Sequence, residues 1–160
     1  MAVYGWGGAV IYQVNTKQLK MVPDERGRLM EILRCDDPFF QKFGQAYVTF
    51  VYPGVVKAWH YHKVQTDHFA CLKGMIKLVL YDNRPGSPTK GEINQFFIGE
   101  HNNLMVSIPP HIQHGFKGIS ETESMVLNLP TEAYNPKEPD EFRLDAHDPS
   151  IPYEWARKDG

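Results

Sequence analysis

Two histidines separated by a single residue, His60 and His62, occupy a segment that is rich in β-forming residues. Because successive side chains of a strand point to opposite faces of the sheet, both imidazoles leave the same face. Val56 and Ala58 share that face, so we expect it to be the inner one. Buried polar groups cost free energy unless they are paired. The two histidines therefore mark the place where we expect the chemistry of the protein.

Two kinds of chemistry are open to these histidines. Together with Asp67 and His114 they form a set of three imidazoles and one carboxylate, which suits a divalent transition metal such as iron, manganese, nickel or zinc. Alternatively, His60 acts without a metal as a general base, because imidazole titrates near neutral pH. The residues by themselves leave both possibilities open.

The glycines around this stretch give it a recognisable spacing. From Gly54 to Gly74 the order is five residues, His-x-His, four residues, an acid and six residues, which resembles the first motif of the cupin superfamily. A later stretch that ends in His114 resembles the second cupin motif, with Asn103 and His111 at the two glycine positions. The resemblance implies an all-β jelly-roll barrel whose interior holds the histidines.

The rest of the chain is predicted to form many short strands separated by turns rich in Gly and Pro, which is typical of an antiparallel barrel or jelly roll. Besides the two strands of the histidine stretch, we expect strands at Ala9–Val14, Leu29–Leu33, Gln45–Tyr52, Met75–Tyr81, Glu92–Ile98, Leu104–Ile108, His114–Gly118 and Met125–Leu129. An acidic start, an early proline and a closing glycine predict one short helix at Asp36–Gly44.

A length of 160 residues predicts a single cupin domain over residues 1–160. Its expected parts are N-terminal strands within 1–34, the barrel within 45–129 and an extended tail over 130–160 that wraps the barrel. The net charge of −2 gives no electrostatic reason to expect nucleic acid or a membrane as a partner. The two cysteines do not indicate a disulfide framework. Without a signal-peptide pattern or a spanning apolar stretch, we expect a cytoplasmic protein.

Several segments also resemble, in order and spacing, the dTDP-4-dehydrorhamnose 3,5-epimerase family, and together they extend over nearly the whole chain. They are Asp24–Gly27, Gly54–Tyr61, Asp82–Arg84 with Ser87–Gly91, Ile108–Phe116, Tyr134–Pro136, and His147–Pro149 with Ile151 and Trp155. The resemblance implies a cupin jelly roll that forms a homodimer and needs no metal. It also implies inversion of carbons next to the 4-keto group of a nucleotide-linked 6-deoxyhexose, in rhamnose-type deoxysugar biosynthesis for O-antigen or other cell-surface polysaccharides.

The resemblance assigns roles position by position. His60 matches the base that removes the proton next to the keto group, and Asp148 matches the carboxylate that orients this histidine. Arg26 matches an arginine that contacts the nucleotide diphosphate, and Lys57 stands where the family has another arginine. His114 matches a histidine that lies in the pocket.

Three positions depart from the family pattern. Asn128 replaces the tyrosine that returns a proton on the opposite face, Asp67 replaces a lysine near the 4-keto oxygen, and His62 replaces a glutamine. The last two changes restore the metal-ligand set of ordinary cupins. Because Asn128 replaces the tyrosine, the identity of the proton donor stays open between Tyr47, Tyr61 and a water molecule.

These observations predict an epimerase or isomerase of a nucleotide-linked 4-keto-6-deoxyhexose, with His60 and Asp148 as catalytic residues and no cofactor. The residues expected to contact the substrate are Arg26, Lys57, His114, Asn128 and Tyr134. One alternative is a metal-dependent cupin that uses His60, His62, Asp67 and His114 as ligands. Another alternative is a cupin that binds a sugar nucleotide without catalysis.

Overall fold

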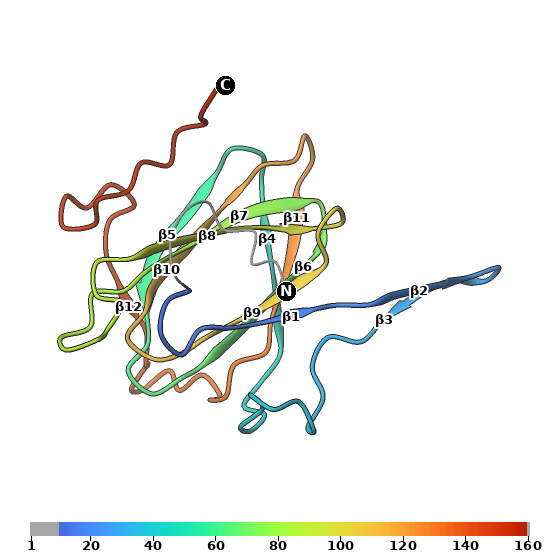
Figure 1. Cartoon of the computed structure of the whole chain (residues 1–160), viewed down its shortest axis with the longest axis horizontal. Helices are drawn as coiled ribbons and strands as arrows, with labels where there is room; N and C mark the ends of the chain where they lie inside the picture. The colour runs from blue at the N-terminus through green and yellow to red at the C-terminus, as the bar shows by residue number, and fades with distance from the viewer. Residues whose placement is uncertain (1–9, 160) are drawn as a thin grey trace.

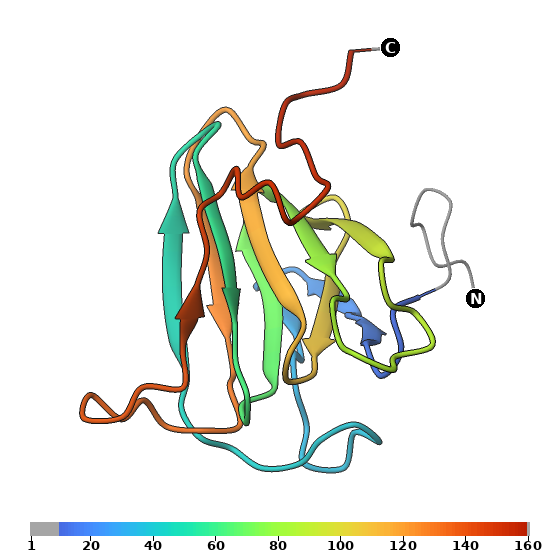
Figure 2. The same cartoon turned by 90° about the vertical axis from the view of Figure 1, so that its left-hand side faces the viewer.

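Strands make up the regular secondary structure of the computed structural model, which describes residues 10–159 (Figure 1). They form two five-stranded antiparallel sheets that face each other (Figure 2). The first sheet has the order β1 (Asn15–Gln18), β9 (Leu104–Ile108), β6 (Asp67–Lys73), β11 (Ser124–Asn128) and β4 (Tyr47–Val51). The second has the order β12 (Phe142–Arg143), β5 (Val56–Tyr61), β10 (Gln113–Gly118), β7 (Met75–Tyr81) and β8 (Ile93–Gly99). Within residues 10–159, no helix could cross a membrane.

The space between the sheets is filled by apolar side chains that alternate along the strands. On β7, Ile76, Leu78 and Leu80 are each 0% exposed and belong to this core. Phe69 and Val106 of the facing sheet belong to the same core cluster. Such alternation with a period of two is typical of strands that turn one face toward a core. Strands β4 and β7 to β11 accordingly begin and end within two residues of their predicted bounds.

The C-terminal segment covers the outer face of the second sheet. Ile151 and Trp155 are almost fully buried and pack against Trp59 of β5 and Val79 of β7. Strand β12 of the same segment pairs with β5 at the edge of this sheet. Strand β7 is therefore buried on both faces, which explains its almost continuous run of apolar residues.

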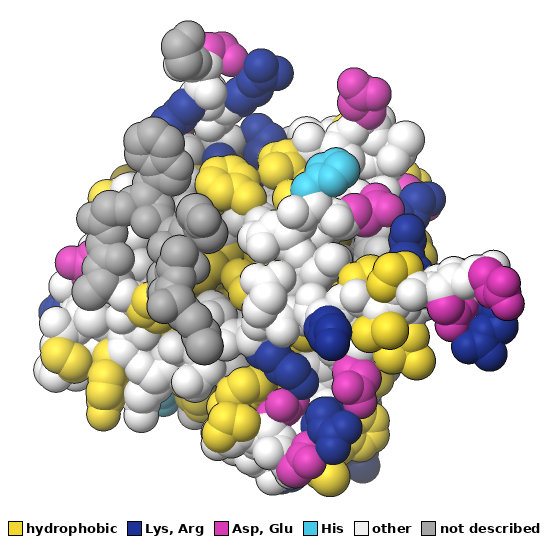
Figure 3. All heavy atoms as spheres, turned by 45° about the vertical axis from the view of Figure 1, so that its right-hand side comes forward, with side chains coloured by type: hydrophobic (Ala, Val, Ile, Leu, Met, Phe, Trp, Pro, Cys, Tyr) yellow, Lys and Arg dark blue, Asp and Glu magenta, His cyan; other side chains and the backbone are white. Residues whose placement is uncertain are grey.

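A separate hairpin of β2 (Met21–Asp24) and β3 (Gly27–Met30) projects from the body of the protein (Figure 1). Its two strands are joined by a two-residue turn, Glu25 and Arg26. Figure 3 shows charged side chains at the tip of this arm and hydrophobic side chains along its base. The strand predicted at Leu29–Leu33 is shifted, because the pairing within the hairpin ends at the last residue of β3.

The short helix predicted at Asp36–Gly44 is wrong, because this segment forms separate turns. The side chain of Asp37 accepts a hydrogen bond from the backbone N–H of Arg34 at 2.8 Å, and the N–H of Gly44 donates to the carbonyl of Pro130 at 2.9 Å. So short a segment gains little from helix formation, since nucleation fixes several residues before the first hydrogen bond forms. The bonds to the rest of the chain therefore decide its conformation.

The strand predicted at Ala9–Val14 is also wrong over its described part, while Ala9 lies outside the described residues. The chain turns at Gln13, which has a φ of 70°, and the N–H of Val14 donates to the carbonyl of Ile11 at 3.0 Å. Ile11 and Val14 are buried in the core. Their apolar character therefore serves packing, and strand pairing begins only with β1.

Candidate active site

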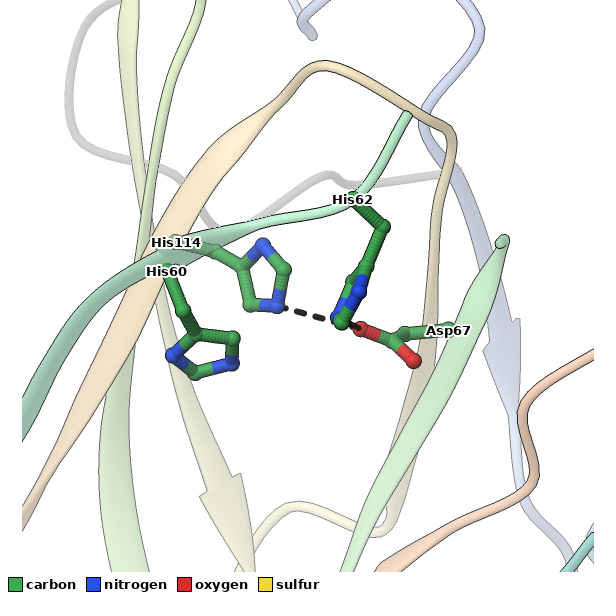
Figure 4. A group of neighbouring side chains, drawn as sticks. All are labelled: His60, His62, Asp67 and His114. Carbon is green, nitrogen blue, oxygen red and sulfur yellow. Dashed lines mark ion pairs between the residues drawn. The ribbon is translucent and has the colours of Figure 1, made fainter. Parts of the chain in front are cut away.

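Three histidines and one aspartate meet between the two sheets (Figure 4). His60 lies on β5 and His62 follows this strand, whereas His114 lies on the neighbouring strand β10 in register with His60. Asp67 is the first residue of β6 in the facing sheet. One ligand atom from each of these residues lies within 4.8 Å of the other three. The structure thus brings together the four side chains that the cupin spacing singled out.

Asp67 connects the members of this cluster, and its side chain is 1% exposed. Its Oδ1 accepts hydrogen bonds from the side-chain amides of Gln65 at 2.7 Å and Asn128 at 2.8 Å. Its Oδ2 lies 3.1 Å from Nε2 of both His62 and His114, as the dashed lines in Figure 4 mark. Neither contact has hydrogen-bond geometry, so among the described residues this buried oxygen has no hydrogen-bond partner.

Backbone carbonyls orient the two imidazoles that face Asp67. Nδ1 of His62 contacts the carbonyl oxygen of Asp140, and Nδ1 of His114 lies 2.9 Å from the carbonyl oxygen of Ile112. Because a carbonyl oxygen only accepts, each Nδ1 donates and each Nε2 is turned toward the carboxylate. Lone pairs of three atoms therefore face one another: Oδ2 of Asp67, Nε2 of His62 and Nε2 of His114. A proton or a cation between these atoms would relieve their repulsion.

The environment changes the pKa values of the cluster in different directions. Burial would raise the pKa of Asp67, but the imidazoles of His114 and His62 outweigh it and hold this pKa well below its usual value. Burial would lower the pKa of His62, but the neighbouring Asp67 outweighs it and raises this pKa. For His60, burial and then the nearby His114 lower the pKa well below its usual value. His60 is therefore a neutral imidazole at neutral pH.

An open pocket of about 940 Å³ begins at this cluster. Its wall includes His60 from β5, Tyr47 from β4 in the other sheet, and Tyr134 and Arg143 from the C-terminal segment. His62 lines the same pocket. A pocket of this volume accommodates a ligand of the size of a sugar nucleotide.

Residues 9–160 match the family described as dTDP-4-dehydrorhamnose 3,5-epimerase. The chain belongs to this epimerase family. A probable low-salt glycan biosynthesis epimerase from Haloferax volcanii is 44% identical over 136 residues, which cover 84% of this chain and 87% of that protein. A spore coat polysaccharide biosynthesis protein from Bacillus subtilis is 39% identical over 142 residues, which cover 89% of this chain and 94% of that protein.

The solved structures agree with the family. A dTDP sugar isomerase from Desulfovibrio desulfuricans G20 superimposes with a TM-score of 0.87 at 34% identity, over 93% of this chain and 94% of that one. The fold is therefore the cupin-like jelly roll that the two motif spacings predicted. Membership of the dTDP-4-dehydrorhamnose 3,5-epimerase family makes the protein an epimerase-type enzyme.

Tyr134 and Lys57, which were predicted to bind the substrate, both line the pocket. Tyr134 is 59% exposed there. Lys57 also lines it, but its ammonium group donates hydrogen bonds to Oγ1 of Thr49 at 2.8 Å and to the carbonyl of Phe50 at 2.6 Å. Lys57 therefore links β5 to β4 across the gap between the two sheets. His114 and Asn128 lie in the buried cluster, 1% and 0% exposed.

Two other predicted residues lie apart from the pocket. The structure does not place Asp148 beside His60: its Oδ1 accepts hydrogen bonds from the N–H and the hydroxyl of Ser150, which close a local turn. Among the described residues, the carboxylate of Asp67 lies near His60 and favours its protonated ring. Arg26 lies at the tip of the projecting hairpin, exposed and paired with Asp24 at 2.7 Å.

Two residues of the site were not predicted from the sequence. Arg143 lines the pocket and is in register with His60, but β12 has only two residues and so carries no periodic signal. Gln65 lies in the loop before β6 and donates to Asp67. Its position between His62 and Asp67 was a usable signal, because a polar residue in that loop stays close to both.

Proposed function

We propose that the protein epimerises a carbon next to the 4-keto group of a nucleotide-linked 6-deoxyhexose, with His60 as the base. The observation that supports this most is a partly buried, neutral imidazole in the wall of a pocket of about 940 Å³. A base must be unprotonated before it removes a proton, and the lowered pKa of His60 keeps it so over a wide pH range. The relatives named for glycan and spore coat polysaccharide biosynthesis support the same kind of pathway for this chain.

Asp67 takes the role that the sequence analysis gave to Asp148. When His60 accepts a proton it becomes an imidazolium ion, which needs a negative charge nearby. The carboxylate of Asp67 lies within 4.8 Å of a ring nitrogen of His60 and favours the protonated ring. We therefore propose that Asp67 stabilises the imidazolium ion of His60. The imidazoles of His62 and His114 also lie beside this carboxylate and share its negative charge.

Exchange of substrate protons with solvent tests this proposal. With dTDP-4-dehydrorhamnose in D₂O, followed by NMR, the wild type should replace the hydrogen next to the keto group with deuterium. His60→Ala should slow this exchange by roughly 10²- to 10⁴-fold, the usual contribution of a general base. His62→Gln should retain most of the exchange. His101→Ala, which changes an exposed histidine, is the matched control.

Two outcomes of this experiment would decide against the proposal. Exchange in His60→Ala at the rate of the wild type would remove His60 as the base. Binding of dTDP-4-dehydrorhamnose by the wild type without any exchange would support the non-catalytic alternative.

A metal-assisted reaction is the second candidate, because the four donor atoms and the unsatisfied Oδ2 of Asp67 fit a divalent transition metal. His60, His62, Asp67 and His114 would hold the ion, with each Nδ1 of His62 and His114 held by a carbonyl as metal-binding imidazoles require. Such an ion would polarise the keto oxygen of the substrate. Elemental analysis after incubation with Zn²⁺, Mn²⁺, Fe²⁺ or Ni²⁺ should then find one equivalent in the wild type and in His101→Gln. His62→Gln should lose it.

We also propose a homodimer in which the hairpin of one copy reaches the pocket of the other. Val22 and Leu29 on the hairpin are 47% and 61% exposed, as expected for a surface that another chain covers. Within the described part of the chain, strand β4 is an unpaired sheet edge with Val48 and Phe50 more than 40% exposed. Such a dimer gives Arg26 at the hairpin tip access to a diphosphate. Light scattering should report twice the chain mass, and a monomer would rule this out.

A further inference from the structure

We propose, on the basis of the proposed epimerase function, that Tyr47 is the acid that returns the proton on the face opposite His60. His60 breaks the C–H bond next to the keto group and leaves an enolate, whose electron pair then takes a proton from the hydroxyl of Tyr47. A new C–H bond forms on the other face and the carbonyl is restored. The remaining imidazolium and phenolate return to neutral side chains by proton exchange with water.

The two residues stand on opposite walls of one pocket. His60 lies on β5 of the second sheet, and Tyr47 lies on β4, the edge strand of the first sheet. Inversion requires a base on one face of the carbon and an acid on the other, and two facing sheets supply this arrangement. Among the described residues, the first sheet also contributes Thr49 and Phe69 to the pocket wall. Neither of them carries a proton acidic enough to quench an enolate.

The orientation of Asn128 leaves the phenolic proton of Tyr47 free. The side-chain Oδ1 of Asn128 accepts the backbone N–H of His68 at 3.0 Å, which fixes the direction of the amide. Its Nδ2 then donates to Oη of Tyr47 at 2.9 Å and to Oδ1 of Asp67 at 2.8 Å. Because the phenolic oxygen accepts this bond, its own hydrogen is available to the pocket.

The same hydrogen bond prepares Tyr47 for its change of charge. Tyr47 and Asn128 are directly opposite each other on paired strands β4 and β11, so the contact follows from the register of the sheet. Burial raises the pKa of Tyr47, which keeps the hydroxyl protonated at neutral pH until the enolate forms. A donor from Asn128 then stabilises the phenolate that results. Asn128, where the family resemblance expects the acid itself, becomes its positioning residue.

Tyr47→Phe separates the two proton transfers. With dTDP-4-dehydrorhamnose in D₂O, the variant should keep the washout of the substrate hydrogen by His60, within about threefold of the wild type. Formation of the inverted sugar should fall by at least 10²-fold, the lower range for loss of a general acid. Tyr52→Phe, on an exposed tyrosine just beyond the same strand and outside the pocket wall, should change neither rate.

The remaining outcomes distinguish this proposal from the function on which it rests. If Tyr47→Phe inverts the sugar as fast as the wild type, Tyr47 is not the acid, although the epimerase function stands. If washout and inversion fall by the same factor, Tyr47 acts only on the structure of the site and the proposal fails. If the wild type shows neither process, the epimerase function fails as well. Circular dichroism and a thermal melt of each variant confirm that the fold is intact.

Discussion

Two buried aspartates, Asp67 and Asp82, have opposite surroundings, although neither side chain is more than 1% exposed. Asp82 follows β7 and accepts five hydrogen bonds, three from Arg84 and one each from the hydroxyls of Ser87 and Thr89. Asp67 accepts two hydrogen bonds, both on Oδ1, and its Oδ2 faces two imidazoles without a hydrogen bond.

The difference supports a structural role for Asp82 and the proposed catalytic role for Asp67. Every donor to Asp82 lies within seven residues of it, so the carboxylate fixes the shape of one loop. The neighbours of Asp67 come from several strands, and two of them are the imidazoles of His62 and His114. Native proteins normally satisfy buried polar groups. An incompletely satisfied one beside titratable groups and a pocket therefore indicates chemistry.

The largest expected effect is the loss of stability caused by the substitution Asp82→Ala. Removing one partner of a buried ion pair costs on the order of 3–5 kcal/mol, since Arg84 and the two hydroxyls lose their acceptor. Urea denaturation should show this loss in the free energy of unfolding. The exchange rate per folded molecule should stay at the wild-type value, because no part of the pocket wall is changed.

Asn83→Ala is the matched control, because this neighbouring side chain is exposed. It should change neither quantity measurably. A folded Asp82→Ala protein without exchange activity would mean that the loop carboxylate also serves the site, and the distinction between the two aspartates would then be lost.

The next effect is on activity, in Asp67→Asn. The amide keeps an oxygen for Gln65 and Asn128 but removes the negative charge that favours protonated His60. Loss of one electrostatic stabiliser of a developing charge lowers rates by roughly 10²- to 10³-fold. Deuterium exchange into dTDP-4-dehydrorhamnose should slow accordingly, while the melting temperature changes less than in Asp82→Ala. A wild-type exchange rate would show that Asp67 has only a structural role.

The sequence reveals one of these aspartates much better than the other. Cupin spacing placed Asp67 with the histidines, because the strands around it alternate regularly and their turns are marked by Gly54 and Gly74. The loop of Asp82 was also predictable as a loop. Its buried carboxylate was not, because composition says nothing about which polar side chains of a loop turn inward. Arg84 two residues later was the available signal.

The path of the C-terminal segment was beyond sequence reasoning for a similar reason. The indole N–H groups of Trp59 and Trp155 both donate to the carbonyl of Ala146, which fixes this part of the segment on the outer face of the sheet. Asp148 follows two residues later and is thereby directed into its own turn. These long-range contacts leave no pattern in the local sequence. The expectation that Asp148 lies beside His60 therefore rested only on the match between this position and the family.

The stabilising contributions of His60 and Asp82 should also be lost in separate pH ranges. The pKa of His60 is lowered, so the stability from its neutral ring is present above about pH 6.5 and is lost as the pH falls toward the folded-state pKa. Burial would raise the pKa of Asp82, but Arg84, Ser87 and Thr89 outweigh it and lower this pKa. Its contribution is present above about pH 4 and is lost only below that.

The free energy of unfolding of two variants, measured from pH 8 to pH 3, should show which residue is responsible for each pH range. His60→Gln should flatten the decrease below pH 6.5, which for one proton amounts to at most about 1.4 kcal/mol per pH unit. Asp82→Ala should flatten the decrease below pH 4 instead. His62, whose pKa is raised, contributes with the opposite sign but is present in both proteins. A His60→Gln profile parallel to that of the wild type would show that the folded protein does not hold His60 as a neutral ring.

The smallest effects come from removing one donor at each aspartate. Thr89→Val takes one of five donors from Asp82 and should cost about 1 kcal/mol of stability, with no change in exchange. Gln65→Met takes one of two donors from Asp67 and should cost a similar amount. It should also slow exchange several-fold, because a less firmly held carboxylate stabilises the imidazolium of His60 less well. If both variants change stability alone, the functional difference between the aspartates lies in the histidines that surround Asp67 and not in how completely each carboxylate is hydrogen-bonded.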